Sequence, residues 1–418
     1  MKSKLAIEGG EPLCKERVTM EHDGVMGEEE VAIATEVIRS GKLWLYNGKY
    51  TGPFEKEFAD YVGVKHAVSY VNATSGIEAS LAAARIKPGD EVITTPFTFI
   101  ATQTAIVRQN GVPIFADIDP HTYTLDAASV EKHVTERTKA IMCVSIFGHP
   151  VDYDGLRKVA DKYNLILIDD AAQATGSDYK GKKVGSQADM SIFSFTAPKS
   201  MTSAGEGGMI TTNNDEFAHR LVLIRAFGYD RPKALAAGRL WHEILGWNGR
   251  MIEVQAAVGS VQLRRLDGFN QRRIENAAYL TKRLSKIDGI VPPYVSDQVK
   301  HNFWVYTIRV QEEKLGISRD RFRKALSAEG VPTASWYTVP NYKQPFIADQ
   351  IGHGDSHCPF QCPLYKGKVD YKNVFLPVTE QACKEVVNLP VHNLLTEKEI
   401  KLVADSIEKV VTLSAGGE

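Results

Sequence analysis

Short apolar runs alternate with amphipathic stretches over the first two thirds of the chain. Runs of about five mainly apolar residues, bounded by Gly, Pro or Asp, are typical of buried strands. They occur at 67–71, 91–95, 113–118, 140–146, 165–169, 189–195 and 208–212. Between the earlier runs, apolar residues recur with the helical period over 76–86, 99–109, 126–134 and 151–163. Strands that alternate with helices predict the α/β class, with a mostly parallel central sheet covered by helices on both faces.

The chain on either side of this alternating segment has a different pattern. Residues 1–26 show little periodicity and predict an extended arm. Helices are predicted over 27–40 and 53–62, since each ends at a glycine that can cap it. Further along come a long helical stretch, a strand-like run and two helices, at 251–287, 301–310, 318–329 and 396–411. The sequence therefore predicts an N-terminal arm over 1–26, a large domain over 27–290 and a smaller C-terminal α+β domain over 291–418.

Composition and charge exclude several classes of function. The 418 residues include 50 Lys and Arg against 51 Asp and Glu, a formal net charge of −1, which argues against a dedicated nucleic-acid-binding protein. No apolar run approaches the roughly 18 residues of a membrane helix. The first residues include two lysines but lack the apolar core of a signal peptide. Together with five cysteines, an odd number, this predicts reduced thiols and a cytoplasmic protein.

Residues that can carry chemistry follow the predicted strands. In a parallel α/β sheet, ligands bind at the carboxyl ends of the strands. Asp169 and Asp170 end one strand and point to opposite faces, so they need a cationic partner or serve as a helix N-cap or a surface pair. Lys199 follows another strand, as a surface lysine or as a desolvated amine that can form a Schiff base. Ser194, within the same strand, could bind an anion.

Two further strand ends complete the pattern. Ser75 and Gly76 open a helix after the first strand, either as an anion site or as a simple cap. Phe99 follows the second strand, and could stack on a planar ring or belong to the core. All these positions share one edge of the predicted sheet. An anion cradle, a stacking aromatic, a carboxylate and a Schiff-base lysine are what pyridoxal phosphate requires, because the carboxylate keeps its pyridine nitrogen protonated.

At these residues the chain resembles a known family, the DegT/StrS-type sugar aminotransferases of PLP fold type I. The resemblance extends from about residue 27 to residue 396. It rests on an ordered set of segments: GPFEKEFADY at 52–61, TSG at 74–76, PGDEVI at 88–93, TFIAT at 98–102, DDAAQ at 169–173, FSF at 193–195 followed by Lys199, GEGG at 205–208, WNGRM at 247–251 and QAA at 255–257.

The resemblance implies a role for each matching residue. Lys199 would form the internal aldimine and shuttle protons, and Asp170 would pair with the ring nitrogen of pyridoxal phosphate. The remaining roles are implied for Gln173 near the phenolic oxygen of the ring, Phe99 stacked on the ring, Ser75, Gly76 and Ser194 at the phosphate, and Asn248 at the phosphate of the neighbouring subunit. The last role implies a homodimer in which Asn248 completes the neighbouring site.

The implied reaction belongs to amino sugar biosynthesis. An amino group would pass from glutamate or glutamine, through Lys199, to the keto group of a sugar, nucleotide-sugar or cyclitol. Residues 5–12 are similar to the start of the cyclitol and deoxysugar branch. The alternatives are a PLP-dependent dehydratase or lyase of the same fold, in which a histidine can replace the lysine, and a non-catalytic partner or regulator. The presence of Lys199 favours transamination.

The sequence also departs from the family pattern. Ile77 stands where the family usually has a threonine, Ser145 replaces a common histidine, and the interval from Lys199 to Gly205 is one residue longer than usual. These departures bear on the choice of substrate.

Other polar residues have less specific patterns. In the C-terminal domain, His353, His357, Cys358 and Cys362 could hint at zinc, but their spacing is not that of a standard zinc module, so we predict no metal and a loop that shapes the substrate mouth. Possible phosphate contacts, or exposed basic residues, are Arg225, Arg231, Arg250 and Lys343.

Overall fold

The computed structural model describes residues 4–16, 18–20 and 25–414. Its centre is a seven-stranded sheet in the order β1-β9-β8-β5-β4-β2-β3. The strands are β1 His66–Tyr70, β2 Glu91–Thr94, β3 Val112–Phe115, β4 Thr138–Val144, β5 Ile166–Asp170, β8 Met190–Ser194 and β9 Gly208–Thr212. Only β9 runs against its neighbours in this sheet, so the carboxyl ends of β1, β2, β4, β5 and β8 meet at one edge.

Helices cover both faces of the sheet. Alternate strand residues explain this, since Ile168 and Ile192 pack with the helices on one face while Leu167 and Phe193 pack with those on the other. The first face is covered by α3 Ala73–Ala83, α4 Ala101–Arg108 and α7 Asp215–Ile224, and the second by α2 Thr51–Val62, α6 Tyr153–Tyr163 and α9 Glu253–Leu284. Each fully buried Ile, Leu or Phe contributes about 1.5–3 kcal/mol. The predicted α/β class with a mostly parallel sheet is confirmed.

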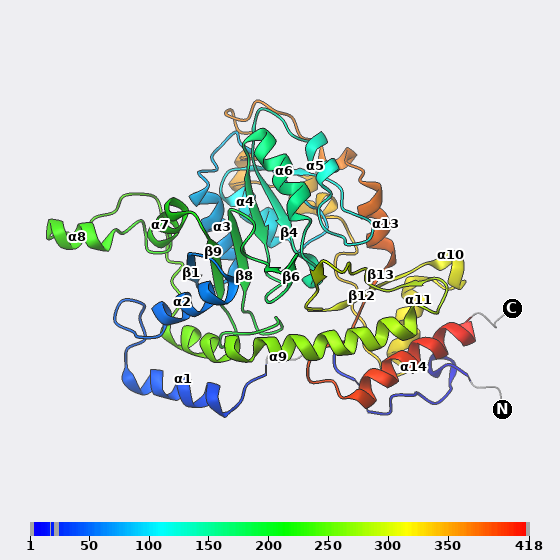
Figure 1. Ribbon diagram of the computed structural model, residues 1–418. Coiled ribbons are helices and arrows are strands. Elements are labelled where there is room, and N and C mark those ends of the chain that lie inside the picture. Colours follow the sequence, from blue (N-terminus) through cyan, green and yellow to red (C-terminus); the bar gives the residue numbers. More distant parts are fainter. Residues whose placement is uncertain (1–3, 17, 21–24, 415–418) are drawn as a thin grey trace.

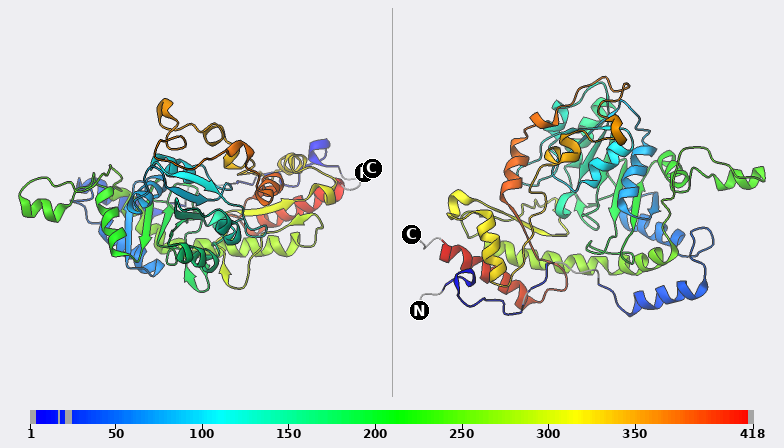
Figure 2. Two further views of the ribbon diagram at one scale, coloured as in Figure 1. Left: turned by 90° about the horizontal axis from the view of Figure 1, so that it is seen from above. Right: turned by 180° about the vertical axis from the view of Figure 1, so that it is seen from behind.

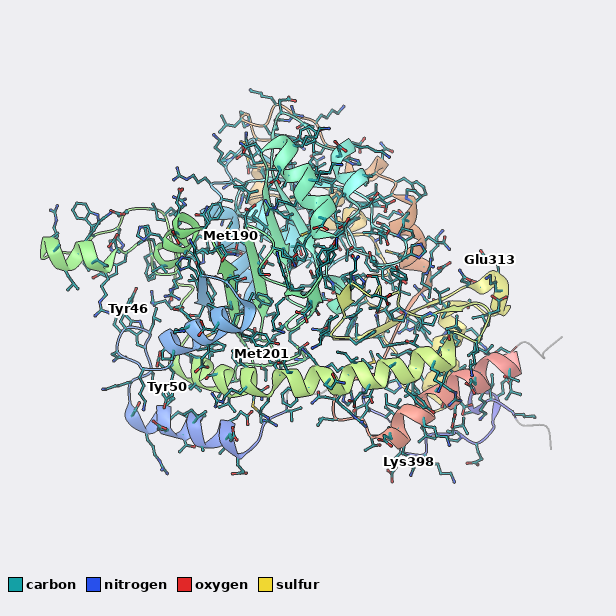
Figure 3. All side chains as sticks on the ribbon, viewed as in Figure 1. Tyr46, Tyr50, Met190, Met201, Glu313 and Lys398 are labelled. Atoms are coloured by element: carbon teal, nitrogen blue, oxygen red, sulfur yellow. The ribbon has the colours of Figure 1, made fainter. Side chains whose placement is uncertain are left out.

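A single helix joins the large and small cores. Helix α9 has 32 residues, roughly 48 Å at 1.5 Å per residue, and runs beneath the sheet in Figure 1. Its first half packs against the sheet core, with Met201 lying just above the helix in Figure 3. Its second half contributes Ala277, Leu280 and Leu284 to the small core. The helix therefore packs against the cores of both predicted domains. The domain boundary at residue 290 stays a prediction.

The small core forms around a second sheet. This sheet has the order β10-β12-β13 and is covered by helices, with β10 Ile290–Val291, β12 Tyr306–Val310, β13 Val386–Leu389, α11 Arg319–Ala328 and α14 Glu397–Ser414. The strand predicted over 301–310 is shorter than expected. Asn302 explains the difference, because its side chain, fully buried, bonds to backbone and side-chain groups outside any ladder and holds 301–304 in an irregular turn.

The remaining elements lie at the periphery. They are α1 Glu28–Ser40, α5 Ala127–Lys132, β6 Asp178–Tyr179, β7 Lys182–Lys183, α8 Arg231–Ala237, β11 Val299–Lys300, α10 Glu312–Leu315, α12 Pro345–Ala348 and α13 Pro377–Glu385. Within the described residues, no helix is both long and apolar enough to cross a membrane.

The segment predicted as an extended arm packs on the C-terminal domain of its own chain. Leu5 and Cys14 are buried in the small core. The backbone N–H groups of Ala6 and Leu13 donate to the carboxylate of Glu329, which is itself buried and paired with Lys409. Residues 1–3, 17 and 21–24 of the predicted arm lie outside the described residues.

A segment between α7 and α9 projects from the body of the molecule. It carries α8, and Figures 1 and 2 show it extending away from the sheet in each view. Leu235, Leu240 and Leu245 on this segment are 72%, 75% and 90% exposed. Three leucines exposed to this extent on one projection are typical of a surface that binds another protein.

Candidate active site

One cavity of about 740 Å³ lies at the sheet edge where the parallel strands end. Its walls come from the segments that follow β1, β2, β5 and β8 and from two segments of the small domain. The lining residues are Asn72, Ala73, Thr74, Ile77, Thr98, Phe99, Ala101, Asp170, Ala172, Gln173, Ser194, Thr196, Pro198, Lys199, Glu206, Trp304, Ser335, Trp336 and Tyr337. A volume of this size suits a cofactor together with a small substrate.

Five of the predicted site residues meet in this cavity, and three do not. Phe99, Asp170, Gln173, Ser194 and Lys199 all line it. Ser75, Gly76 and Asn248 are absent from its lining, although Thr74 and Ile77, the immediate neighbours of Ser75 and Gly76, belong to it.

The structure gives those three residues other surroundings. The Ser75 hydroxyl accepts a hydrogen bond from Nε1 of Trp247 at 3.1 Å. Gly76 faces the sheet, because a Cβ added there would lie 3.1 Å from Cγ2 of Ile192. Asn248 is exposed on the projecting segment. Their predicted roles at a phosphate therefore remain predictions.

Asp170 presents its carboxylate to the cavity from the end of β5. Its Oδ2 accepts a hydrogen bond from the Thr102 hydroxyl at 2.9 Å, and its Oδ1 accepts from the backbone N–H of Ala172 at 3.3 Å. Burial raises the pKa of Asp170 above its usual value, while these two bonds and the positive charge of Lys199 act in the opposite direction. The carboxylate is therefore held in place and shares the cavity with an amine.

Asp169, the preceding residue, points to the opposite face. Its carboxylate accepts hydrogen bonds from the hydroxyls of Ser145 and Tyr153 and lies outside the cavity lining. Of the two aspartates, Asp170 thus shares its surroundings with a cation, Lys199, whereas Asp169 is satisfied by hydroxyl donors. Ser145, one of the departures from the family pattern, faces this buried carboxylate. Burial is the main reason why the pKa of Asp169 is raised to about 7.

The raised pKa of Asp169 predicts a pH-dependent stability. The folded protein holds the Asp169 proton up to a pH of about 7, whereas the unfolded chain releases it near 4, so the folded state binds more protons in between. The free energy of unfolding therefore falls as the pH rises through this window, by up to about 4 kcal/mol from this group. Urea unfolding at a series of pH values measures it. The Asp169→Asn variant should lack this component, and an identical pH profile in the variant would contradict the prediction.

Lys199 follows β8 in a tightly bonded loop. The backbone N–H of Lys199 donates to Thr196 O at 3.0 Å, and the N–H of Ala197 donates to Gly205 O at 3.1 Å. Gly205 has a φ of +103°, a conformation that favours glycine. The long interval from Lys199 to Gly205 is thus closed by bonds across its own base. Ser194, at the end of β8, lines the same wall of the cavity.

Gln173 connects the large domain to the small one. Its Oε1 accepts from the backbone N–H of Phe147 at 2.7 Å, and its Nε2 donates to the hydroxyl of Tyr337 at 3.1 Å. Burial raises the pKa of the Tyr337 phenol, which keeps it protonated. Phe99, 61% exposed, offers an uncovered ring at the cavity wall.

The basic residues considered as phosphate contacts are engaged within the chain. Arg225 contradicts that expectation most clearly, because it is buried and forms an ion pair with Glu55. Lys343 pairs with Glu380. The guanidinium groups of Arg231 and Arg250 lie over the rings of Tyr46 and Phe227, each 5.2 Å from the centroid.

The histidine and cysteine loop near residue 357 contributes nothing to the lining of this cavity, contrary to the expectation of a loop at the substrate mouth. His353 and His357 bond to the backbone oxygens of Val107 and Gln350. Over the described ranges, one group of three potential metal ligands has its ligand atoms within 4.8 Å of one another, at His219, Asp230 and Glu243. Lys233 already pairs with both of its carboxylates.

Sequence reasoning missed several residues of the site. Thr102 was included only within a family motif, and Trp304, Trp336 and the role of Tyr337 had no prediction. The two tryptophans offered a signal, because each lies next to a small-domain strand or bridge and combines an apolar ring with a polar N–H group. They are far in sequence from the strand ends, so the sequence did not show that they line the same cavity.

The donor set fits pyridoxal phosphate. An amine on Lys199 can condense with an aldehyde, and the Asp170 carboxylate can hold a protonated ring nitrogen. Helix α3 begins at the cavity wall, and a helix N-terminus attracts phosphate. Asp170, Ser194 and Lys199 therefore supply groups suited to three separate parts of that cofactor.

Comparisons with known proteins agree with this geometry. A model of the DegT/DnrJ/EryC1/StrS aminotransferase family matches residues 25–361 and 359–408. The chain is 36% identical to a GDP-perosamine synthase of Caulobacter vibrioides (87% of this chain, 91% of that protein) and 36% identical to a pleiotropic regulatory protein of Geobacillus stearothermophilus (91% and 93%). An aminotransferase structure from Psychrobacter cryohalolentis superposes with a TM-score of 0.84 at 31% identity, covering 93% of this chain and 98% of that one.

Proposed function

Since the chain belongs to the DegT/DnrJ/EryC1/StrS aminotransferase family, we propose that it uses pyridoxal phosphate to transfer an amino group from glutamate or glutamine to the keto group of a sugar, nucleotide-sugar or cyclitol. The observation that carries this proposal is the meeting of Lys199 and Asp170 in one cavity at the carboxyl edge of the sheet. The name of the related GDP-perosamine synthase supports an acceptor of the sugar class.

Each residue of the cavity has a task in this reaction. Pyridoxal phosphate, when bound, supplies an electron sink for the electron pair left at the α carbon of the amino donor. The Nζ atom of Lys199 would remove a proton and return it within each half of the reaction, starting at that α carbon of the donor in the first half and ending at the aminated carbon of the acceptor in the second. The Asp170 carboxylate keeps the ring nitrogen protonated, and its bonds to Thr102 and Ala172 fix its orientation.

The other lining residues bind and orient. Ser194 and the first turn of α3 would hold the phosphate, and Phe99 would cover one face of the ring. Gln173 would bind near the phenolic oxygen, and its bond to Tyr337 fixes its amide in one orientation. Trp304, Trp336 and Tyr337 of the small domain form an aromatic wall of the cavity, which would shield the reacting groups from water.

We also propose a homodimer in which Asn248 completes the neighbouring site. Two features support it: Asn248 is exposed on the projecting segment, and that segment carries the exposed leucines described above. A second copy of the chain would cover these leucines and receive Asn248 near the phosphate.

A product analysis tests the proposed reaction. Holoenzyme is incubated with glutamate or glutamine and a panel of keto-sugars, nucleotide-keto-sugars and inososes. We expect a 2-oxo acid and an aminated acceptor in equal amounts, both detected by mass spectrometry. Loss of water from the acceptor without formation of a 2-oxo acid would indicate a dehydratase instead. A protein that takes up no pyridoxal phosphate would defeat the proposal and favour a non-catalytic role.

A further inference from the structure

The indole of Trp304 lies directly against the amine of Lys199. The Nζ atom is 3.8 Å from the centroid of the indole, over its face. A cation held over an aromatic face within about 6 Å is attracted by the negative face of the ring, most strongly when water is excluded. Trp304 is half-buried in the cavity wall, so the contact is partly shielded from solvent.

Several bonds fix the position of this indole. Its Nε1 donates to the backbone oxygen of Pro198, the residue before Lys199, at 2.8 Å. The backbone N–H of Trp304 donates to Oδ1 of Asn302 at 2.9 Å. The Nδ2 atom of Asn302 donates in turn to the backbone oxygens of Gln173 and Thr175, at 3.2 and 3.1 Å. The indole is thus bonded to the lysine loop. The backbone of Trp304 is connected, through Asn302, to the loop that follows Asp170.

A second tryptophan stacks on the indole of Trp304. The rings of Trp304 and Trp336 stack with centroids 4.9 Å apart and an interplanar angle of 16°. Trp336 is itself anchored, because its backbone N–H donates to Oδ1 of the fully buried Asn388 at 2.9 Å. Rotating Trp304 away from Lys199 would break both the stack and the bond to Pro198.

Other charged and titratable groups share the cavity with the Lys199 amine. They are Asp170 at the end of β5, Glu206 in the segment before β9 and the Tyr337 phenol of the small domain. The Asp170 carboxylate interacts with the charge of Lys199 and favours an ammonium ion whichever residue occupies position 304, and Glu206 is a second carboxylate in the lining. A test of the indole must therefore leave both carboxylates unchanged.

We propose that Trp304 is a positioning residue for Lys199: while the amine is not bonded to the cofactor, the indole face holds it in place and stabilises its protonated form. This rests on the proposed function, because only a transaminase cycle releases the lysine in every turnover while the cofactor carries the amino group. The indole keeps the amine at one place between the two halves of the reaction.

Competitive labelling of the amine tests the proposal without an activity assay. Enzyme loaded with pyridoxamine phosphate is treated with limiting acetic anhydride at a series of pH values, and acetylation of Lys199 is quantified by mass spectrometry. Trp304→Leu keeps an apolar side chain but removes the aromatic face, so the pKa of Lys199 should fall by about one unit. Trp304→Phe keeps a ring and should restore part of the shift.

Trp336→Leu is the matched control, because it removes the stacked partner and leaves the face above Lys199 intact. We expect it to shift the pKa less than Trp304→Leu does. An unchanged or raised pKa in both Trp304 variants, or an equal fall in Trp336→Leu, would overturn the proposal. The same labelling of cofactor-free protein measures the pKa of the Lys199 amine even if no donor yields a 2-oxo acid. A failure of the proposed function can therefore be told apart from a failure of this proposal.

Discussion

We expect the Lys199→Ala variant to lose aminotransferase activity by at least about 10³-fold. Lys199 supplies the only amine in the described lining of the cavity, and alanine can neither bond to the cofactor aldehyde nor move a proton at the α carbon of the donor. Two measurements check this: formation of the 2-oxo acid from glutamate or glutamine, and the visible absorbance that the wild-type holoenzyme owes to its lysine–cofactor bond. Both should be lost together.

A second lysine provides the control for this variant. Lys180 lies in the β6–β7 hairpin, outside the cavity lining, and pairs with Asp154 at the surface. Lys180→Ala should keep the activity and the absorbance of the wild type. Added methylamine should restore part of the activity of Lys199→Ala, because a small amine can reach the cavity. Activity that survives in Lys199→Ala without added amine would exclude Lys199 as the catalytic amine.

The central sheet could be predicted because its signal is local. Buried parallel strands need unbroken apolar runs, and the runs ending at Asp170 and Ser194 are short and clearly bounded. Their shared direction then places the polar residues that follow them at one edge. For this reason the meeting of Asp170, Ser194 and Lys199 could be expected from the sequence alone.

The far wall of the cavity could not be predicted in the same way. Trp304 reaches Lys199, with Trp336 stacked on it, only because α9 carries the chain across to the small domain and the following segments return to the sheet edge. No periodic pattern of apolar residues predicts that these segments return to the sheet edge. Hydrogen bonds of the buried Asn302 to the backbone at Gln173 and Thr175 fix it instead, and such bonds appear only in three dimensions.

The details of Ser75 and Gly76 were also beyond the sequence. A helix that begins after β1 predicts an anion site, but which residues of its first turn face the cavity depends on a rotation of about 100° per residue. The structure turns Gly76 toward Ile192 and leaves Thr74 and Ile77 at the cavity. The expectation that Arg225 could contact a phosphate was wrong for another reason that only the fold shows. Its ion-pair partner, Glu55, lies far away in the sequence.

The second large effect is expected from Asp170→Asn. The amide has the shape of the carboxylate: its oxygen can accept from the backbone N–H of Ala172, and its NH2 group can donate to the Thr102 hydroxyl, which then acts as acceptor, so the fold should be preserved. A neutral amide cannot hold a proton on the ring nitrogen of the cofactor through a charge-assisted bond. We therefore expect the rate of the donor half-reaction to fall roughly 10²–10⁴-fold. Stopped-flow absorbance with saturating glutamate or glutamine measures this rate.

Asp169→Asn is the control that the structure offers for this experiment. The two carboxylates are neighbours on β5, yet Asp169 bonds to Ser145 and Tyr153 on the opposite face and lies outside the cavity lining. Asp169→Asn should change the pH dependence of stability and leave the half-reaction within a few-fold of the wild type, whereas Asp170→Asn should slow the half-reaction strongly. Equal losses of rate in both variants would mean that the carboxylates act through the fold, and Asp170 would then have no direct contact with the cofactor.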